Sequence, residues 1–105
     1  MEPGNRRAPL TAALGFARLE LQPPPPALVA LKTWLGSWSG IGAVIAGMTR
    51  QGFNVELRQF PEGWRANFYP AGLAHSIVTG SAWEPTPGLA VQRAAWQALN
   101  KPEPA

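Results

Sequence analysis

The sequence predicts an α+β domain: a three-stranded antiparallel sheet packed on one face by helices, in the order helix, strand, strand, strand, helix, with an extra N-terminal helix. Two neighbouring segments, 53–61 and 64–69, alternate apolar and polar residues, which is typical of half-buried strands. The segment 86–100 repeats its apolar residues with a helical period instead. A hairpin followed by an amphipathic helix is the simplest arrangement that buries both apolar faces.

The domain boundaries follow from the prolines. Pro23 to Pro26 form a break that neither a helix nor a strand crosses. The 105 residues suffice for one hydrophobic core, so we expect a single domain at 27–100. Residues 1–26 are expected to be a flexible Pro-rich tail, in which a short helix fits residues 10–21, and residues 101–105 a C-terminal tail.

Two helices are expected between the prolines and the sheet. The first has one apolar stripe, and Ser39 and Gly40 interrupt it; the stripe consists of Leu28, Leu31, Leu35 and Trp38. The second has Gly52 as its C-terminal cap; its stripe consists of Ile41, Val44, Ile45 and Met48. Because glycines also stand at 40, 42 and 47, a strand in this segment is the alternative.

The alternating segments predict a β-hairpin that turns at Glu62 and Gly63. In this register Leu57 faces Phe68 and Arg58 faces Asn67. The same apolar side of both strands would face the helices. A third strand is expected at 75–83, with a bulge at Gly80.

The last helix has a clear start and two apolar sides. Thr86 is placed as its N-cap and Pro87 as its first residue. One face has mostly small side chains, which would let the helix approach the sheet closely. It consists of Ala90, Val91, Ala94, Ala95, Ala98 and Leu99. Leu89 and Trp96 lie on the other side, so we expect an earlier helix to contact them.

This order of elements, with the passage from Gly80 to Leu99 and its paired alanines, resembles the double-stranded-RNA-binding domain over residues 41–100. The resemblance implies that fold and an RNA-binding function. In that family, lysines at the start of the last helix grip phosphates, whereas this chain has uncharged residues there, Pro87, Gly88, Leu89 and Ala90. We therefore expect the fold to carry over and duplex binding not to.

A second resemblance is to HicB-like antitoxin domains, which run strand, strand, strand, helix. Trp64 to Phe68, Gly80 and the helix from Thr86 to Leu99 can be laid on that pattern. The Pro-Gly-Cys turn typical of that family is missing here. The resemblance implies a partner-binding protein of a toxin–antitoxin or similar accessory system.

The residue types argue against enzymatic chemistry. The chain has no cysteine and no aspartate, and His75 is its one imidazole. Thiol catalysis, thiolate metal sites and a nucleophile–base pair therefore lack their residues. We expect a non-enzymatic binding module without catalytic residues, metal or cofactor.

Arginines and aromatic residues share the outward side of the predicted hairpin, at Arg58, Phe60, Arg65 and Tyr69. Such a side resembles a stacking platform for unpaired bases, and the net charge of +3 is compatible with a nucleic-acid partner. An ordinary solvated face and a homodimer through two such faces are the alternatives. Nucleic acid through the open sheet face is our first functional hypothesis.

The competing hypothesis is a protein-interaction or antitoxin-like module that uses Leu89, Arg93 and Trp96. Among the other tryptophans, Trp38 and Trp64 are expected in the core, and Trp34 and Trp83 are candidates for a surface patch with Trp96. The stretch between Lys32 and Arg50 is uncharged but rich in glycine and hydroxyl residues, which disfavours a membrane span. We expect a cytoplasmic protein with no membrane partner.

Overall fold

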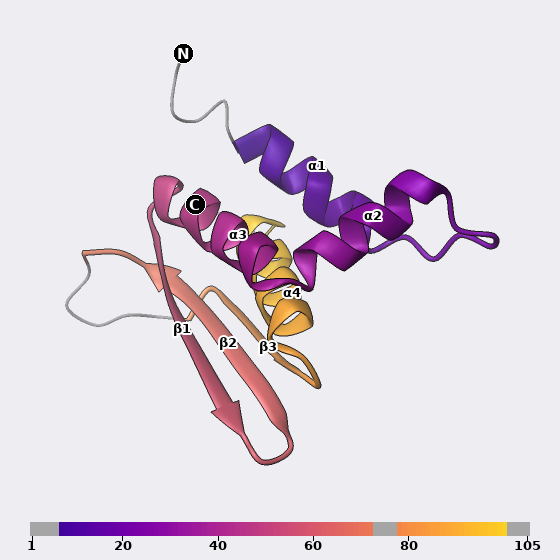
Figure 1. Ribbon diagram of the computed structural model, residues 1–105. Coiled ribbons are helices and arrows are strands. Elements are labelled where there is room, and N and C mark those ends of the chain that lie inside the picture. Colours follow the sequence, from indigo (N-terminus) through magenta and orange to yellow (C-terminus); the bar gives the residue numbers. More distant parts are fainter. Residues whose placement is uncertain (1–6, 73–77, 101–105) are drawn as a thin grey trace.

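Helices cover one face of an open antiparallel sheet (Figure 1). The computed structural model describes residues 7–72 and 78–100. The elements follow in chain order as α1 (Arg7–Ala17), α2 (Pro26–Leu35), α3 (Trp38–Arg50), β1 (Phe53–Phe60), β2 (Gly63–Pro70), β3 (Gly80–Glu84) and α4 (Pro87–Asn100). The sheet order is β1-β2-β3. The predicted α+β fold class is confirmed.

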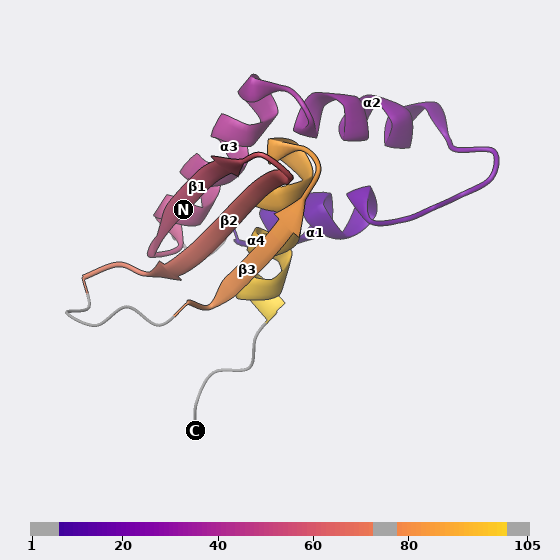
Figure 2. The same cartoon turned by 90° about the horizontal axis from the view of Figure 1, so that it is seen from below.

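The core lies between the sheet and α4, which runs along the inner face of the sheet (Figure 2). Phe68 of β2 is fully buried there. The helix contributes the predicted face of Ala90, Val91, Ala94, Ala95, Ala98 and Leu99, all of them buried. Small side chains let α4 approach closely: a Cβ at Gly80 would lie 2.0 Å from the carbonyl oxygen of Ala94. Gly80 therefore serves a close approach. The β2–β3 pairing ends at the pair Phe68–Gly80, and Thr79 N donates a hydrogen bond of 2.7 Å to Phe68 O, so the bulge expected at Gly80 stays a prediction.

The hairpin forms, but in a register different from the predicted one. Leu57 pairs with Ala66, and Val55 is the residue opposite Phe68. The loop consists of Pro61 and Glu62, and Gly63 already belongs to β2. Gly63 begins β2 with a φ of 152°, and a Cβ there would lie 2.6 Å from the Glu84 carbonyl oxygen, so this position requires glycine. The shift is one full pleat period, so every side chain stays on its predicted face.

The N-terminal helix is part of the core. Leu14 of α1 is 2% exposed and belongs to the core cluster. Arg7 Nη2 donates a hydrogen bond of 2.6 Å to the carbonyl oxygen of Leu99. The structure thus differs from the expected flexible tail at 1–26, because α1 supplies the contact that Trp96 needs: its ring lies 3.0 Å from where a Cβ at Gly15 would stand. The folded part includes residues well before 27.

The break between α2 and α3 falls earlier than predicted. Helix α2 ends at Leu35, and Ser37 caps α3 by accepting a hydrogen bond of 3.2 Å from Gly40 N. Gly40 therefore lies inside α3, and a Cβ there would meet the carbonyl oxygen of Trp34 at 2.0 Å, so glycine allows the close packing at the break. Trp38 consequently begins α3 and is 64% exposed, so its predicted place in the core was wrong.

Two predicted helix ends are confirmed. Gly52 follows α3 with a φ of 88°, as a C-terminal glycine requires. Leu89 N donates a hydrogen bond of 3.2 Å to Thr86 Oγ1, and α4 begins at Pro87. The third strand begins at Gly80, later than predicted, and its expected start at His75 lies outside the described residues.

Candidate functional site

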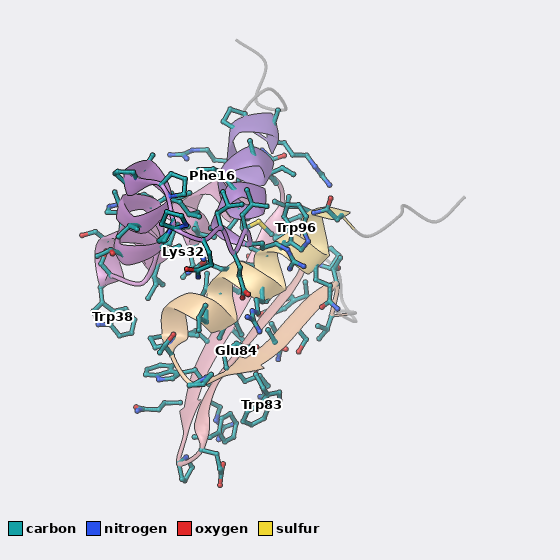
Figure 3. The ribbon with its side chains drawn as sticks, turned by 90° about the vertical axis from the view of Figure 1, so that its right-hand side faces the viewer. Phe16, Lys32, Trp38, Trp83, Glu84 and Trp96 are labelled. Atoms are coloured by element: carbon teal, nitrogen blue, oxygen red, sulfur yellow. The ribbon has the colours of Figure 1, made fainter. Side chains whose placement is uncertain are left out.

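The outer face of the sheet carries a cluster of aromatic rings and guanidinium groups. It consists of Arg58 and Phe60 on β1, Arg65 on β2 and Trp83 on β3, and we call it the sheet platform. The rings of Phe60 and Trp83 lie 4.6 Å apart between centroids and are tilted by 42°. Trp83 is 52% exposed and lies on the side of the sheet away from α4 (Figure 3).

The two arginines stack on these rings. The Arg65 guanidinium lies 5.1 Å from the ring centroid of Phe60 and 5.8 Å from that of Trp83. The Arg58 guanidinium lies 5.2 Å from the centroid of Phe60. These distances are those of cation–π contacts, which hold the side chains over one another. The platform is therefore an ordered surface in which charge and aromatic area alternate.

A polar network continues from the platform across all three strands. Glu56 Oε1 accepts hydrogen bonds of 3.0 Å from Arg65 Nη2 and 3.2 Å from Asn67 Nδ2. Ser81 Oγ in turn donates one of 2.6 Å to Asn67 Oδ1. Glu56 thus balances the charge of Arg65, whereas Arg58, directly opposite Arg65 in the register, has no ion pair within residues 7–72 and 78–100.

The structure brings together three of the four residues predicted for this face and separates the fourth. Tyr69 lies on the same face but four residues beyond Arg65, which is about 13 Å along a strand. Trp83 takes part instead, because it is the register partner of Arg65. Sequence reasoning missed it, because the alternation from His75 to Trp83 is irregular and gives no clear register for the third strand.

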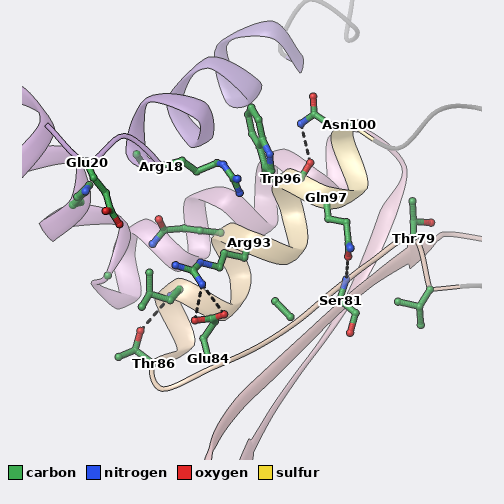
Figure 4. Close-up of a pocket in the computed structure, with 17 residues that line it drawn as sticks. Arg18, Glu20, Thr79, Ser81, Glu84, Thr86, Arg93, Trp96, Gln97 and Asn100 are labelled. Carbon is green, nitrogen blue, oxygen red and sulfur yellow. Dashed lines mark hydrogen bonds and ion pairs between the residues drawn. The ribbon is translucent and has the colours of Figure 1, made fainter.

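The three residues of the competing surface also lie together. Leu89, Arg93 and Trp96 line an open groove of about 1470 Å³ between α4, β3 and the end of α1 (Figure 4). Two of them already have intramolecular partners. Arg93 Nη1 forms an ion pair of 3.0 Å with Glu84 Oε2, and the Arg18 guanidinium lies 5.1 Å from the Trp96 ring centroid.

The expected patch of Trp34, Trp83 and Trp96 does not form. Trp83 lies on the outer face of the sheet, whereas Trp96 packs against α1 on the far side of α4 (Figure 3). Trp34 is 46% exposed on α2. Trp64 is half-buried against the core as expected, and its ring meets that of Trp38 edge-on at 5.9 Å.

In the described part of the chain, no three His, Cys, Asp or Glu side chains lie close enough together to hold a metal ion. His75 lies outside the described residues. No single described helix has the length and hydropathy of a membrane span; α2 and α3 reach them only as a pair, which is bent by 80° at the break.

The chain matches no family model, no curated protein and no solved structure. The likeness to double-stranded-RNA-binding domains and to HicB-like antitoxins therefore stays a prediction. The described residues offer two surfaces for a partner, the sheet platform and the groove along α4.

Proposed function

We propose that this protein is a non-enzymatic binding module that holds single-stranded nucleic acid on the sheet platform. The observation that supports the proposal is the Phe60–Trp83 ring pair on the outer face of the sheet, in which Trp83 is 52% exposed and Phe60 half-buried, with Arg58 and Arg65 stacked on it. Aromatic rings next to cations are the elements with which proteins bind unpaired strands: a stacked base contributes about 1–3 kcal/mol, and arginines contact the phosphates.

The charge arrangement points to an anionic partner. Arg58 and Arg65 occupy directly opposite positions on β1 and β2, and like charges in such positions destabilise a sheet. Glu56 compensates only one of them. A phosphate beside Arg58 would convert this unfavourable pair into a favourable site. The Nε of Arg65 is buried without a hydrogen-bond partner, which adds to the cost of keeping the pair without a ligand.

Unpaired strands suit this surface better than a duplex. Base stacking on Phe60 or Trp83 requires a base whose face is free, which a duplex does not offer. Duplex recognition also needs several cationic contacts to phosphates. The start of α4, where the double-stranded-RNA-binding family has its lysines, is uncharged in this chain from Pro87 to Ala90.

The experiment is a titration of labelled single-stranded DNA and RNA, with a duplex of the same sequence, followed by fluorescence anisotropy. We expect binding at about 50 mM salt that weakens markedly at about 200 mM. Trp83→Ala should lower the affinity by roughly 5- to 150-fold, which is the loss of one stacking contact of about 1–3 kcal/mol. Trp34→Ala, which removes a similarly exposed tryptophan from α2, should leave the affinity unchanged. Absence of binding at low salt would refute the proposal.

A protein partner on the groove along α4 is the second candidate. The exposed Leu89 in a groove of about 1470 Å³ favours this candidate. The groove is the weaker candidate surface, because Arg93 and Trp96 already have partners within the chain. Leu89→Glu separates the two: it should leave oligonucleotide affinity intact if the platform binds. If the protein binds no oligonucleotide, and Leu89→Glu abolishes the binding of a purified protein partner, the groove is the binding surface.

A further inference from the structure

The two edges of the sheet are protected to different degrees. Strand β3 forms one edge and β1 the other (Figure 1). The β3 edge is short, with five residues, and the side chain of Gln97 from α4 accepts a hydrogen bond of 2.6 Å from Ser81 N there. Strand β1 has eight residues and, among the described residues, pairs with β2 alone. A long regular edge strand is a template for pairing with another chain.

The free edge of β1 presents a regular row of backbone groups. Ala71 N donates a hydrogen bond of 2.9 Å to Gly52 O, which fixes the alternation of the ladder. Every second residue of β1 therefore directs its N–H and C=O groups away from β2; these residues are Phe53, Val55, Leu57 and Gln59. The strand has no proline, lysine or bulge, which are common means of blocking an edge.

The charges of β1 select the occupant of this edge. Glu56 and Arg58 lie two residues apart on its outer face. If a second β1 pairs antiparallel so that Leu57 lies opposite its own copy, each Glu56 lies directly opposite Arg58 of the other chain. A shift of one pleat period in either direction would instead place two glutamates or two arginines opposite each other. The strand is therefore self-complementary in the register centred on Leu57.

The side chains involved have capacity left for this contact. Glu56 Oε1 accepts hydrogen bonds from Arg65 and Asn67, whereas Oε2 accepts none from a described residue. Arg58 forms no ion pair with any residue that the structure describes. On the inner face Leu57 is half-buried at the margin of the core, so two copies would cover each other's exposed part.

We propose that two copies of this chain pair through β1 into one six-stranded antiparallel sheet. The twofold axis runs perpendicular to the sheet at Leu57, so both outer faces lie on the same side. The two sheet platforms then belong to one continuous surface. The dimer does not depend on nucleic-acid binding: Glu56 of the second copy takes the place beside Arg58 that a phosphate would otherwise fill, and the Phe60–Trp83 ring pair stays open.

Sedimentation equilibrium of the full chain without nucleic acid tests the charge pairing. We expect a reversible dimer. Arg58→Glu should weaken dimerisation by about tenfold or more, because both cross-strand pairs become repulsive. The double variant Glu56→Arg/Arg58→Glu should restore the dimer, since it exchanges the two charges and still leaves an acid opposite Arg65. A dimer that Arg58→Glu leaves intact, or a loss that the double variant does not reverse, would overturn the proposal.

Gln59→Pro tests the edge itself. The N–H of Gln59 points away from β2, so proline removes a hydrogen bond to the second copy and none within the hairpin. It should abolish the dimer with unchanged circular dichroism, and Gln59→Ala, the matched control, should keep it. A chain that stays monomeric up to about 100 µM would refute the β1 dimer. So would a dimer that survives Gln59→Pro and dissociates with Trp83→Ala, because its copies would meet through their outer faces.

Discussion

The two faces of the sheet share one backbone and differ in what their side chains do. On the inner face Ala66 and Phe68 are fully buried beneath α4. On the outer face Arg58, Arg65 and Trp83 keep contact with solvent while stacking on Phe60 or on one another. Burial gives the inner face most of its stabilising free energy, whereas exposed ion pairs and stacks contribute little. The inner face therefore decides the fold, and the outer face is free to bind.

The largest effect is expected on the inner face, from Phe68→Ala. Phe68 is 0% exposed, and truncation of a buried phenylalanine costs about 3–5 kcal/mol through lost burial and a cavity. Urea unfolding followed by far-UV circular dichroism measures the loss. Arg58→Ala on the outer face is the control and should change the free energy of unfolding by less than about 1 kcal/mol. Similar losses in both variants would remove the distinction between the faces.

The next effect concerns the close approach of α4 to the inner face. A Cβ at Gly80 would lie 2.0 Å from Ala94 O and 2.9 Å from Ala98 Cβ, so Gly80→Ala should cost about 1–3 kcal/mol or more. Gly42→Ala is the matched control, since Gly42 is an exposed position of α3 where a Cβ meets nothing within 4 Å. It should stabilise the protein by about 0.5–1 kcal/mol. A tolerated Gly80→Ala in the same unfolding assay would show that α4 does not lie so close.

The smallest effect on stability is expected from Glu56→Gln on the outer face. Its ion pair with Arg65 has side-chain exposures of 51% and 28%, and such pairs contribute about 0–1 kcal/mol. The same change removes a negative charge beside the platform. Oligonucleotide affinity should therefore rise by roughly a few-fold at low salt, an effect that added salt should diminish. A fall in affinity would mean that Glu56 positions Arg65 rather than competing with the phosphate.

Local patterns predicted the elements better than their contacts. The cap at Thr86, the glycine after α3 and the buried alanine face of α4 depend on neighbouring residues, and all three are confirmed. The predicted register of the hairpin was wrong by one pleat period, because a shift of two residues leaves the alternation of apolar and polar residues unchanged. Trp38 was placed in the core by a helical stripe that in fact ends at Leu35.

The sequence predicted only part of the candidate site, because a local pattern gives the side of a strand but not its partners in the sheet. Arg58, Phe60 and Arg65 were found because their side of the strand follows from alternation within one hairpin. Trp83 joins them through the pairing of β2 with β3, which no local pattern in the third strand specified.

The sequence by itself determined the period of the hairpin strands and of α4, and with it the face on which their side chains lie. That information is local, because it depends only on the 2-residue repeat of a strand and the 3.6-residue repeat of a helix. The tertiary structure decided which segments meet: α1 packs on Trp96, and Trp83 pairs with Arg65. Those contacts join residues far apart in the chain, and their free energy depends on shape and distance that a one-dimensional pattern does not contain.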